Sequence, residues 1–192
     1  MTAPDVRTSE SDPLRVHWVP DLPTAGALGL TLAPGKHGQS FYHPTGWARD
    51  LDTDLERLRY HHRADVLVSL MEDHEYDLLE IPDLRARARD TGLEVRHYPI
   101  PDESVPPPWR EDDFAQLIAG IRRSLDDGRR VVVHCRGGVG RSGLVAAAVA
   151  TTYGDEADAA IARVRRAQPQ AVETREQEAF VVGFAAATGE RD

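Results

Sequence analysis

The sequence predicts an α/β fold in which helices flank a central, mainly parallel sheet as a three-layer sandwich. Two observations support this fold class. Short apolar runs rich in valine and leucine alternate along the chain with longer segments of helical periodicity, which is typical of a parallel sheet. The chain has 192 residues, 41% of them hydrophobic, which suffices for one domain with a sizeable core.

In the first half of the chain, β-branched runs predict strands and regularly spaced leucines predict helices. The expected elements, in order, are a strand pair at 16–19 and 28–32, a turn-rich loop at 35–46, a helix marked by Leu51, Leu55 and Leu58, a strand at 65–70, a short helix at 75–81 and a helix at 83–90 with Pro82 in its first turn. Three aromatic residues near the turn-rich loop could wall the mouth of a pocket or pack as ordinary aromatics: Phe41, Tyr42 and Trp47.

The second half continues the alternation. The expected elements are a strand at 93–98, a proline-rich loop at 98–109, a helix from Glu111 with the buried stripe Phe114, Leu117, Ile118, Ile121 and Leu125, a strand at 131–133, and helices at 144–153, 156–167 and 174–188. Together these elements predict a single domain at 14–188, with a loose N-terminal tail at 1–13 and a C-terminal tail at 189–192.

The segment from His134 to Gly143 concentrates the chemistry of the chain. It runs from a buried strand through a glycine-rich loop into a helix, so several backbone N–H groups point at one spot that favours an anion. Cys135, the only cysteine, opens this loop, and Arg141 closes it six positions later. In such surroundings the pKa of a cysteine, ~8.5 when free, falls to roughly 4–7. The spacing therefore predicts a thiolate nucleophile.

The same loop suits a phosphoryl group. Its amides can hold three non-bridging oxygens, and Arg141 adds a planar, two-pronged donor. Glycines let the backbone curl, because positive φ costs them little. The residues predicted to bind phosphate are Arg136, Gly137, Gly138, Val139, Gly140 and Arg141. The alternative is an inert buried cysteine in a glycine-rich turn that binds nothing.

Three further residues are expected to support the loop. Ser142 could donate a hydrogen bond to the sulfur, and His134 could fix the loop as a structural histidine rather than as a proton carrier. Gln177 lies on an apolar helix face, where a glutamine must be hydrogen-bonded or near a polar site. A core or capping amide is the alternative for Gln177.

Dephosphorylation by a thiolate needs an acid that protonates the departing oxygen. The proline-rich loop at 98–109 cannot continue as sheet or helix, and a stiff loop that carries carboxylates suits a lid. Asp102 is the candidate acid because the preceding strand and a short apolar approach deliver it first. Glu103 is the second choice, and an ordinary solvated turn residue is the alternative for either.

These segments resemble the cysteine-dependent protein phosphatases, the tyrosine and dual-specificity superfamily, and most of all the cyclin-dependent-kinase-associated phosphatase group. The similar stretches occur in the same order between about Leu28 and Phe184, at 32–36, 98–102, 134–143 and 171–177. The resemblance implies a tyrosine-phosphatase-like fold, a phosphatase domain without a cofactor, and a phosphoprotein or phosphopeptide substrate. The chain is short for the tyrosine-specific enzymes, so dual specificity is expected, toward phosphotyrosine and toward phosphoserine or phosphothreonine.

The resemblance also implies roles for individual residues. Cys135 would attack phosphorus and form a cysteinyl-phosphate, while Arg141 and the loop amides bind the phosphoryl group. Asp102 would act as general acid and then as general base, and Gln177 would help to place the water. Many relatives carry glutamine where Glu173 stands, so the negative charge of Glu173 is expected to point away from the phosphate.

The composition of the chain argues against several classes of binding partner. The formal net charge of −9 argues against nucleic acid or an anionic membrane as the main partner. A single cysteine excludes a disulfide within the chain and suits the cytoplasm, and no targeting or membrane-spanning pattern is visible. The histidines lack the spacing of metal ligands, so no metal site is expected. Nothing in the sequence defines the oligomeric state.

Two other functions share some of these features. A rhodanese-type sulfurtransferase also places a cysteine in an anion-binding loop, but by resemblance that loop is usually one residue shorter and needs no acid loop. A non-catalytic phosphopeptide-binding module on the same fold would be expected to lack the nucleophile, the arginine or the acid. Cys135, Arg141 and Asp102 are all present here, which favours the phosphatase.

Overall fold

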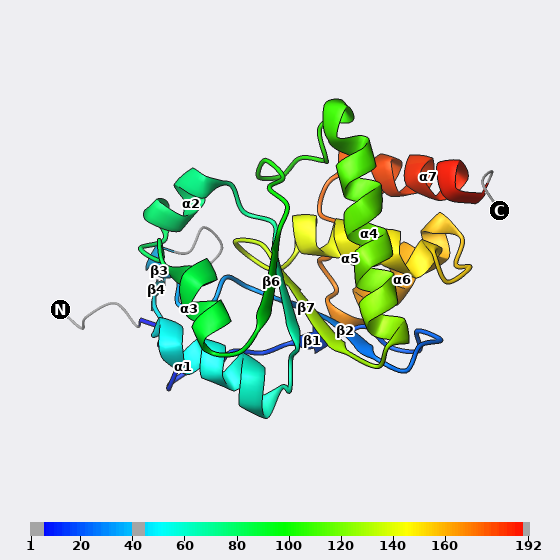
Figure 1. Ribbon diagram of the computed structural model, residues 1–192. Helices are drawn as coiled ribbons and strands as arrows, with labels where there is room; N and C mark the ends of the chain where they lie inside the picture. The colour runs from blue at the N-terminus through cyan, green and yellow to red at the C-terminus, as the bar shows by residue number, and fades with distance from the viewer. Residues whose placement is uncertain (1–5, 40–44, 190–192) are drawn as a thin grey trace.

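The computed structural model describes residues 6–39 and 45–189 and contains a five-stranded sheet in the order β1-β2-β7-β5-β6 (Figure 1). β1 pairs antiparallel with β2, and the other neighbours pair in parallel. The strands are β1 (His17–Trp18), β2 (Ala27–Thr31), β5 (Val66–Ser69), β6 (Glu94–His97) and β7 (Arg130–His134). The mainly parallel sheet expected from the sequence is therefore confirmed.

Helices cover both faces of this sheet, which confirms the three-layer sandwich (Figure 1). One face carries α4 (Glu111–Asp126), α5 (Gly140–Thr151), α6 (Ala157–Ala167) and α7 (Arg175–Gly189). The other face carries α1 (Leu51–Glu56) with its π-helical continuation η1 (Arg57–His61), α2 (Asp73–Leu78) and α3 (Leu84–Asp90).

Alternation along the central strand β7 supplies both cores. Val131 and Val133 pack with α4, α5, α6 and α7, whereas Val132 packs toward α1, α2 and α3. All three valines are fully buried, and burial of each side chain contributes about 1.5–3 kcal/mol. A run of consecutive valines thus suits a central strand with helices on both faces.

The parallel register gathers the carboxyl ends of three strands at one edge. His134, the last residue of β7, pairs with Thr31 of β2 on one side and with Ser69 of β5 on the other. In open α/β sheets, ligands bind outside the carboxyl ends of the strands. The loop that follows His134 begins at this edge.

Several element boundaries differ from the sequence prediction. A small antiparallel hairpin of β3 (His37–Gln39) and β4 (Gly46–Ala48) forms inside and just beyond the loop expected at 35–46. Pro82 lies before Asp83, the N-cap of α3, and not in its first turn. α4 follows a short 3-10 turn, η2 (Pro108–Arg110). Phe41 and Tyr42 lie outside the described residues.

The most consequential difference is the start of α5. Apolar periodicity predicts this helix from residue 144, but it begins at Gly140, and the N–H of Gly143 already donates to the carbonyl of Val139 (2.9 Å). Arg141 and Ser142 are therefore in the first helical turn and not in the loop.

Part of the N-terminal segment, residues 6–13, makes hydrogen bonds with β4 and with the residues that follow it. The N–H of Arg7 donates to Gly46 (3.0 Å), and the N–H of Ala48 donates back to Arg7 (3.0 Å). Ser9 is buried and exchanges hydrogen bonds with Asp50. These contacts hold the described part of this segment against β4.

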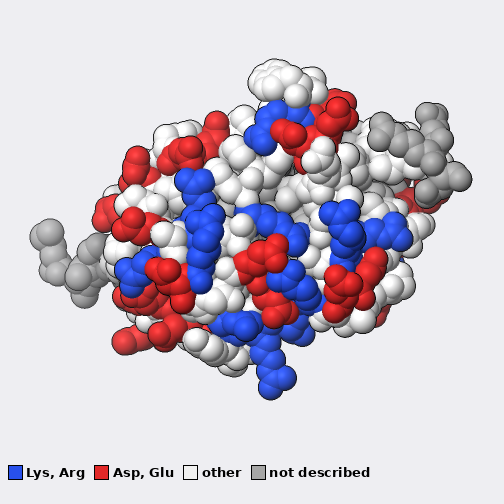
Figure 2. Space-filling model, in the orientation of Figure 1, with Lys and Arg blue, Asp and Glu red and all other residues white. Residues whose placement is uncertain are grey.

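Charges of both signs are mixed on the face over α3, β6 and α4 (Figure 2). β6 is an edge strand, and two charged residues on one of its faces, Glu94 and Arg96, pair with each other (2.8 Å). Charged side chains of this kind discourage pairing with another sheet edge. Among the described helices, none is long and apolar enough to cross a membrane.

Candidate active site

Cys135 lies directly after β7, and its residue is only 3% exposed. Its Sγ accepts a hydrogen bond from the N–H of Gly138 (3.2 Å), so a backbone donor already faces the sulfur. Gly138 has φ of +72°, and a methyl group there would lie 2.4 Å from the backbone of Thr31. Only glycine permits this turn against the end of β2.

Arg141 stands on the first turn of α5 and is 1% exposed. Its Nη1 and Nη2 donate to the two carboxylate oxygens of Glu75 on α2 (2.6 and 2.8 Å), and Nη1 also donates to the carbonyl of Ile100 (3.0 Å). This bidentate pair fixes the plane of the guanidinium. Nε is buried and has no hydrogen-bond partner among the described residues.

Opposing effects act on the ionisation of this pair. Burial favours the neutral form of both groups, but the hydrogen bonds between them and their mutual attraction dominate. The pKa of Arg141 is therefore raised, with Cys135 and Asp102 adding to the effect, and the pKa of Glu75 is lowered below its usual value. Arg141 remains a permanent cation at the loop.

Asp102 reaches the same guanidinium from the proline-rich loop. Its Oδ1 lies 2.8 Å from Arg141 Nη2, and its Oδ2 lies 3.9 Å from Arg136 Nη1. Buried Tyr98 and Ile100 anchor the approach from β6, since their N–H groups bond to Ser69 and Leu70 at the end of β5. The side chain of Asp102 is 50% exposed, so a substrate can reach it.

Glu103, the second choice for the acid, lines the same cleft but has its backbone at φ +57° and donates its N–H to Asp102. The structure places the carboxylate of Asp102, and not that of Glu103, in an ion pair with the arginine of the loop.

Two of the three residues expected to support the loop, His134 and Ser142, are fully buried. His134 Nδ1 lies 3.3 Å from the carbonyl oxygen of Cys135, and burial lowers the pKa of His134 to about 4, so the ring is neutral near pH 7. The hydroxyl of Ser142 makes no hydrogen bond with any described residue, the sulfur of Cys135 included. It is a buried donor close to the loop.

Gln177 is fully buried at the start of α7 and connects two segments. Its Oε1 accepts from the N–H groups of Glu173 (2.9 Å) and Thr174 (3.3 Å), and its Nε2 donates to the carbonyl of Ser104 in the acid loop (3.1 Å). The expectation that this buried amide is hydrogen-bonded is met. Its contacts tie α7 to the loop that carries Asp102.

Glu173 does not point away, contrary to the sequence expectation. A methyl group on Gly140 would lie 2.9 Å from Glu173 Oε2, and Glu173 lines the cleft above the loop. The reason is the backbone of the preceding turn, which Arg165 of α6 holds through the carbonyls of Ala171 (2.9 Å) and Val172 (2.8 Å).

These residues surround a cleft of about 640 Å³. Cys135, Asp102 and Arg141 line it together with Arg136, Gly137, Val139 and Gly140, so most of the predicted phosphate-binding residues share one space. Trp47 lines this cleft, which agrees with the first of its two expected roles, as part of a pocket wall. Lys36 lies beside Trp47. Within residues 6–39 and 45–189, no three His, Cys, Asp or Glu side chains converge as a metal site.

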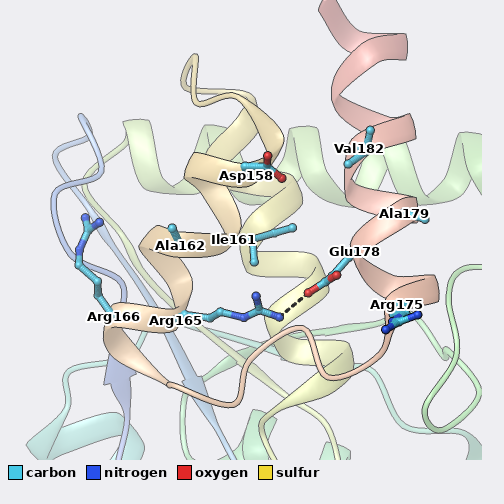
Figure 3. Close-up of a pocket in the computed structure, with 9 residues that line it drawn as sticks. All are labelled: Asp158, Ile161, Ala162, Arg165, Arg166, Arg175, Glu178, Ala179 and Val182. Carbon is cyan, nitrogen blue, oxygen red and sulfur yellow. Dashed lines mark hydrogen bonds and ion pairs between the residues drawn. The ribbon is translucent and has the colours of Figure 1, made fainter.

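A second hollow of about 830 Å³ lies between α6 and α7 (Figure 3). Ile161 and Val182 give it an apolar wall, and Arg165 pairs with Glu178 across it (2.7 Å). It contains none of the predicted site residues. The predicted site residues therefore lie around the cleft at the end of β7 and not around this hollow.

Comparison with known families agrees with this geometry. The family model described as "Polymorphic toxin system, DSP-PTPase phosphatase" matches residues 47–155, which include the acid loop, the nucleophile loop and α5. The chain belongs to this DSP-PTPase phosphatase family. The predicted dual-specificity and tyrosine phosphatase superfamily is thereby confirmed.

Curated proteins of similar sequence include cyclin-dependent kinase inhibitor 3 of several mammals. Cyclin-dependent kinase inhibitor 3 of Sus scrofa is 29% identical over 143 residues, and that of Rattus norvegicus is 28% identical over 143 residues. Each alignment covers 72% of this chain and 61% of the relative, so the chain spans about three fifths of the length of these relatives.

Solved structures share the fold. A kinase associated phosphatase (KAP), crystallised with serine in place of its catalytic-site cysteine, has a TM-score of 0.80 at 20% identity over 98% of both chains. The active form of Tk-PTP has a TM-score of 0.68 at 25% identity, covering 89% of this chain and 96% of the other. The predicted tyrosine-phosphatase-like fold is confirmed.

Two residues that contact the loop or its arginine, Glu75 and Lys36, are not predicted as site residues by the sequence. Glu75 stood only in an expected short helix, and nothing in the local pattern linked it to Arg141, 66 positions away. A buried arginine needs a carboxylate as its partner. The one sequence signal for this partner is the acidic start of the helix that follows the strand predicted at 65–70. Lys36 lies in the stretch at 32–36, whose similarity to the phosphatase family is weak, and the sequence predicts no role for it.

Proposed function

We propose that this protein hydrolyses phosphomonoesters on phosphoproteins through a cysteinyl-phosphate on Cys135. The observation that carries the proposal is the convergence of three groups on one cleft. The sulfur accepts a backbone N–H, the buried Nε of Arg141 has no hydrogen-bond partner among the described residues, and the Asp102 carboxylate lies 2.8 Å from the same guanidinium. A phosphoryl group would satisfy the unpartnered donor and the loop amides together.

The first step transfers the phosphoryl group to sulfur. As the phosphate enters, its oxygens replace the Asp102 carboxylate as partners of Arg141, and the carboxyl group is released to carry a proton. The Cys135 thiolate attacks phosphorus, the S–P bond forms and the P–O ester bond breaks. Asp102 gives its proton to the leaving oxygen, and Arg141 with the loop amides stabilises the charge on the transferred group.

The second step releases phosphate. The Asp102 carboxylate takes a proton from water, the water oxygen bonds to phosphorus, and the S–P bond breaks to return the thiolate. Gln177 helps to place this water, a role consistent with its hydrogen bond to the acid loop. Ser142, a buried hydroxyl that bonds to nothing in the described part of the chain, donates to the sulfur as it leaves.

The proposed substrates carry phosphotyrosine and also phosphoserine or phosphothreonine. The curated relatives are named as inhibitors of a cyclin-dependent kinase, and a solved neighbour is named as kinase associated. A phosphoprotein substrate is consistent with those names. The cleft is bordered by Trp47 and Leu79, which can pack against an aromatic or an aliphatic phosphorylated side chain.

Hydrolysis of para-nitrophenyl phosphate in the presence of a chelator tests the reaction. We expect turnover by the wild-type chain, best under mildly acidic conditions, and none by Cys135→Ser. Turnover that survives this substitution would contradict the thiolate mechanism. A panel of phosphopeptides with the Cys135→Ser form as a trap then reports which phosphorylated residues bind.

The same assays separate the rival functions. Sulfur transfer from thiosulfate to cyanide without phosphate release would identify a rhodanese-type enzyme. Tight binding of phosphopeptides without any release of phosphate by the wild-type chain would identify a binding module.

A further inference from the structure

The chain contains 22 arginines and one lysine. That lysine, Lys36, lines the same cleft as Cys135 and is only 8% exposed. Lysine is among the residues least often buried without a reason. Its position is therefore unusual both in the composition of this chain and in the structure.

The ammonium of Lys36 contacts both the nucleophile loop and an aromatic ring. Its Nζ donates to the carbonyl of Arg136 (3.3 Å), the first residue after the nucleophile, and lies 4.3 Å from the centre of the Trp47 ring. The N–H of Ala33 donates to the same carbonyl (3.4 Å). Two donors from one turn thus hold the carbonyl oxygen of a single peptide in the phosphate-binding loop.

A buried network fixes the turn that carries Lys36. Gly35 has φ of +71°, its N–H donates to Asp54 Oδ2 (2.9 Å), and Asp54 forms a fully buried bidentate pair with Arg49. The N–H of Arg49 donates to the carbonyl of Lys36 (3.3 Å). The lysine is therefore placed by the protein interior and not by the loop that it touches.

A trans peptide directs its C=O and its N–H to opposite sides. The bond between Arg136 and Gly137 is trans, like every described peptide bond. Donors that hold the Arg136 carbonyl on the side of the turn consequently hold the Gly137 N–H on the other side. Gly137 lines the cleft in which the phosphoryl group is proposed to bind.

We propose that Lys36 is a positioning residue for the phosphate-binding loop: its ammonium holds the Arg136–Gly137 peptide so that the Gly137 N–H faces the phosphoryl group, and its charge favours the thiolate of Cys135. This inference rests on the proposed function and adds a residue to it. The loop then depends on a group outside its own sequence.

The charged groups around Lys36 make this role sensitive to pH. Burial is the main cause that lowers the pKa of Lys36 to about 8, and the cations Arg49, Arg136 and Arg7 lower it further. The negative charge of Cys135 acts in the opposite direction. A negative charge on Cys135 thus favours the charged form of Lys36.

Lys36→Met and Lys36→Gln separate the two parts of the role. Methionine keeps the length of the side chain but removes both donor and charge, whereas glutamine keeps a donor. For Lys36→Met we expect kcat/KM to fall roughly tenfold to hundredfold, mainly through KM, with a similar loss of affinity for inorganic vanadate. Lys36→Gln should retain more vanadate affinity, and both variants should alkylate more slowly with iodoacetamide at pH 6.

Arg15→Met is the matched control, because it removes a cation whose side chain is 77% exposed. It should leave kcat/KM, vanadate affinity and alkylation unchanged. A folded Lys36→Met variant with wild-type vanadate affinity and alkylation rate would overturn the inference. So would a variant that loses activity only in proportion to its loss of folded protein.

A second measurement needs neither turnover nor a lysine variant. Selective ¹³C-lysine labelling gives a single lysine Cε signal, because the chain has one lysine. Its titration midpoint should move to lower pH in Cys135→Ser, which removes the thiolate. An unmoved midpoint would contradict the coupling, whereas a wild-type chain that shows the coupling but no phosphatase activity would defeat the proposed function alone.

Discussion

At the scale of single residues, the candidate site depends on partners that are distant in the chain. The loop supplies Cys135 and leads into Arg141, but the orientation of Arg141 comes from Glu75 on α2 and from the carbonyl of Ile100 before the acid loop. An arginine that is 1% exposed cannot be left without a carboxylate at low cost. Binding and stability are therefore linked at this pair.

Glu75→Gln should expose that link. The amide keeps the shape of the side chain but leaves the buried charge of Arg141 without its bidentate partner, so we expect a loss of about 3–5 kcal/mol in the free energy of unfolding. In the folded fraction, kcat/KM should fall by roughly tenfold or more, as the guanidinium loses its fixed plane. Urea denaturation and steady-state kinetics measure the two effects.

Asp73→Asn is the control for that substitution. Asp73 is on the same helix and pairs with Arg85 (2.9 Å), but its side chain is 78% exposed. Exposed pairs contribute about 0–1 kcal/mol, so stability and turnover should barely change. Equal effects of the two substitutions would mean that Glu75 has no special role in holding Arg141.

Asp102→Ala tests the assignment of the acid. Removal of a general acid typically costs roughly 10²–10⁴ in rate, and the loss should be largest for substrates with poor leaving groups. The alkaline limb of the pH–rate profile should also flatten, because no proton donor remains to be titrated. Glu103→Ala is the neighbouring control, and the assignment fails if that variant shows the larger loss.

Arg141→Lys tests the geometry of the phosphate donor. Lysine keeps the positive charge but cannot supply the planar fork that contacts both Glu75 and a phosphoryl group. Vanadate affinity should fall by roughly tenfold or more, as measured by inhibition of turnover. Wild-type affinity would show that charge alone is sufficient.

At the scale of elements, the sequence predicts the site where local chemistry specifies it and fails where the partner is distant. Local sequence features predict the strand–loop–helix unit: the valines of β7, the glycines of the loop and the apolar residues of α5. Apolar periodicity predicts the start of α5 four residues late, because it begins only with the apolar residues, whereas the glycine-containing first turn is already helical. Lys36 and Glu75 were missed because their roles arise from tertiary contacts with the loop.

Gly138→Ala tests how the loop fits against β2. Glycine at φ +72° allows a turn that a Cβ would oppose, and the added methyl group would also lie 2.4 Å from the backbone of Thr31. The backbone must shift, so we expect a loss of about 1–3 kcal/mol in unfolding free energy together with loss of vanadate binding. Thermal denaturation and inhibition assays report the two effects.

Gly137→Ala provides the comparison for stability. A Cβ at Gly137 meets no atom within 4 Å, and this glycine is not among those with positive φ. Its unfolding free energy should stay within about 0.5 kcal/mol of the wild-type value. A similar destabilisation by both alanines would show that the close contact of Gly138 with β2 is unimportant.

At the scale of the whole molecule, the fold and the proposed chemistry require different protonation. Asp102 must carry a proton in the first step, which acid favours. Three histidines, however, have their pKa values lowered by burial: His134, His62 and His97. Each is held neutral by the folded state, so acid favours the unfolded chain.

His134 gives the largest expected effect, because its pKa falls from 6.5 to about 4. Between these values the unfolded chain binds more protons than the folded one, so stability rises with pH across this window and is lost on acidification. The contribution of His134 is at most ~3 kcal/mol between pH 6.5 and 4.

Urea denaturation at half-unit steps of pH should show unfolding free energy falling over this range. In His134→Asn, which cannot titrate there, that fall should be much smaller, whereas a substitution of the exposed His74 by glutamine should leave it intact. An unchanged pH dependence in His134→Asn would mean that other groups control acid unfolding, and that the residue before the nucleophile does not limit how acidic the protein's working range can be.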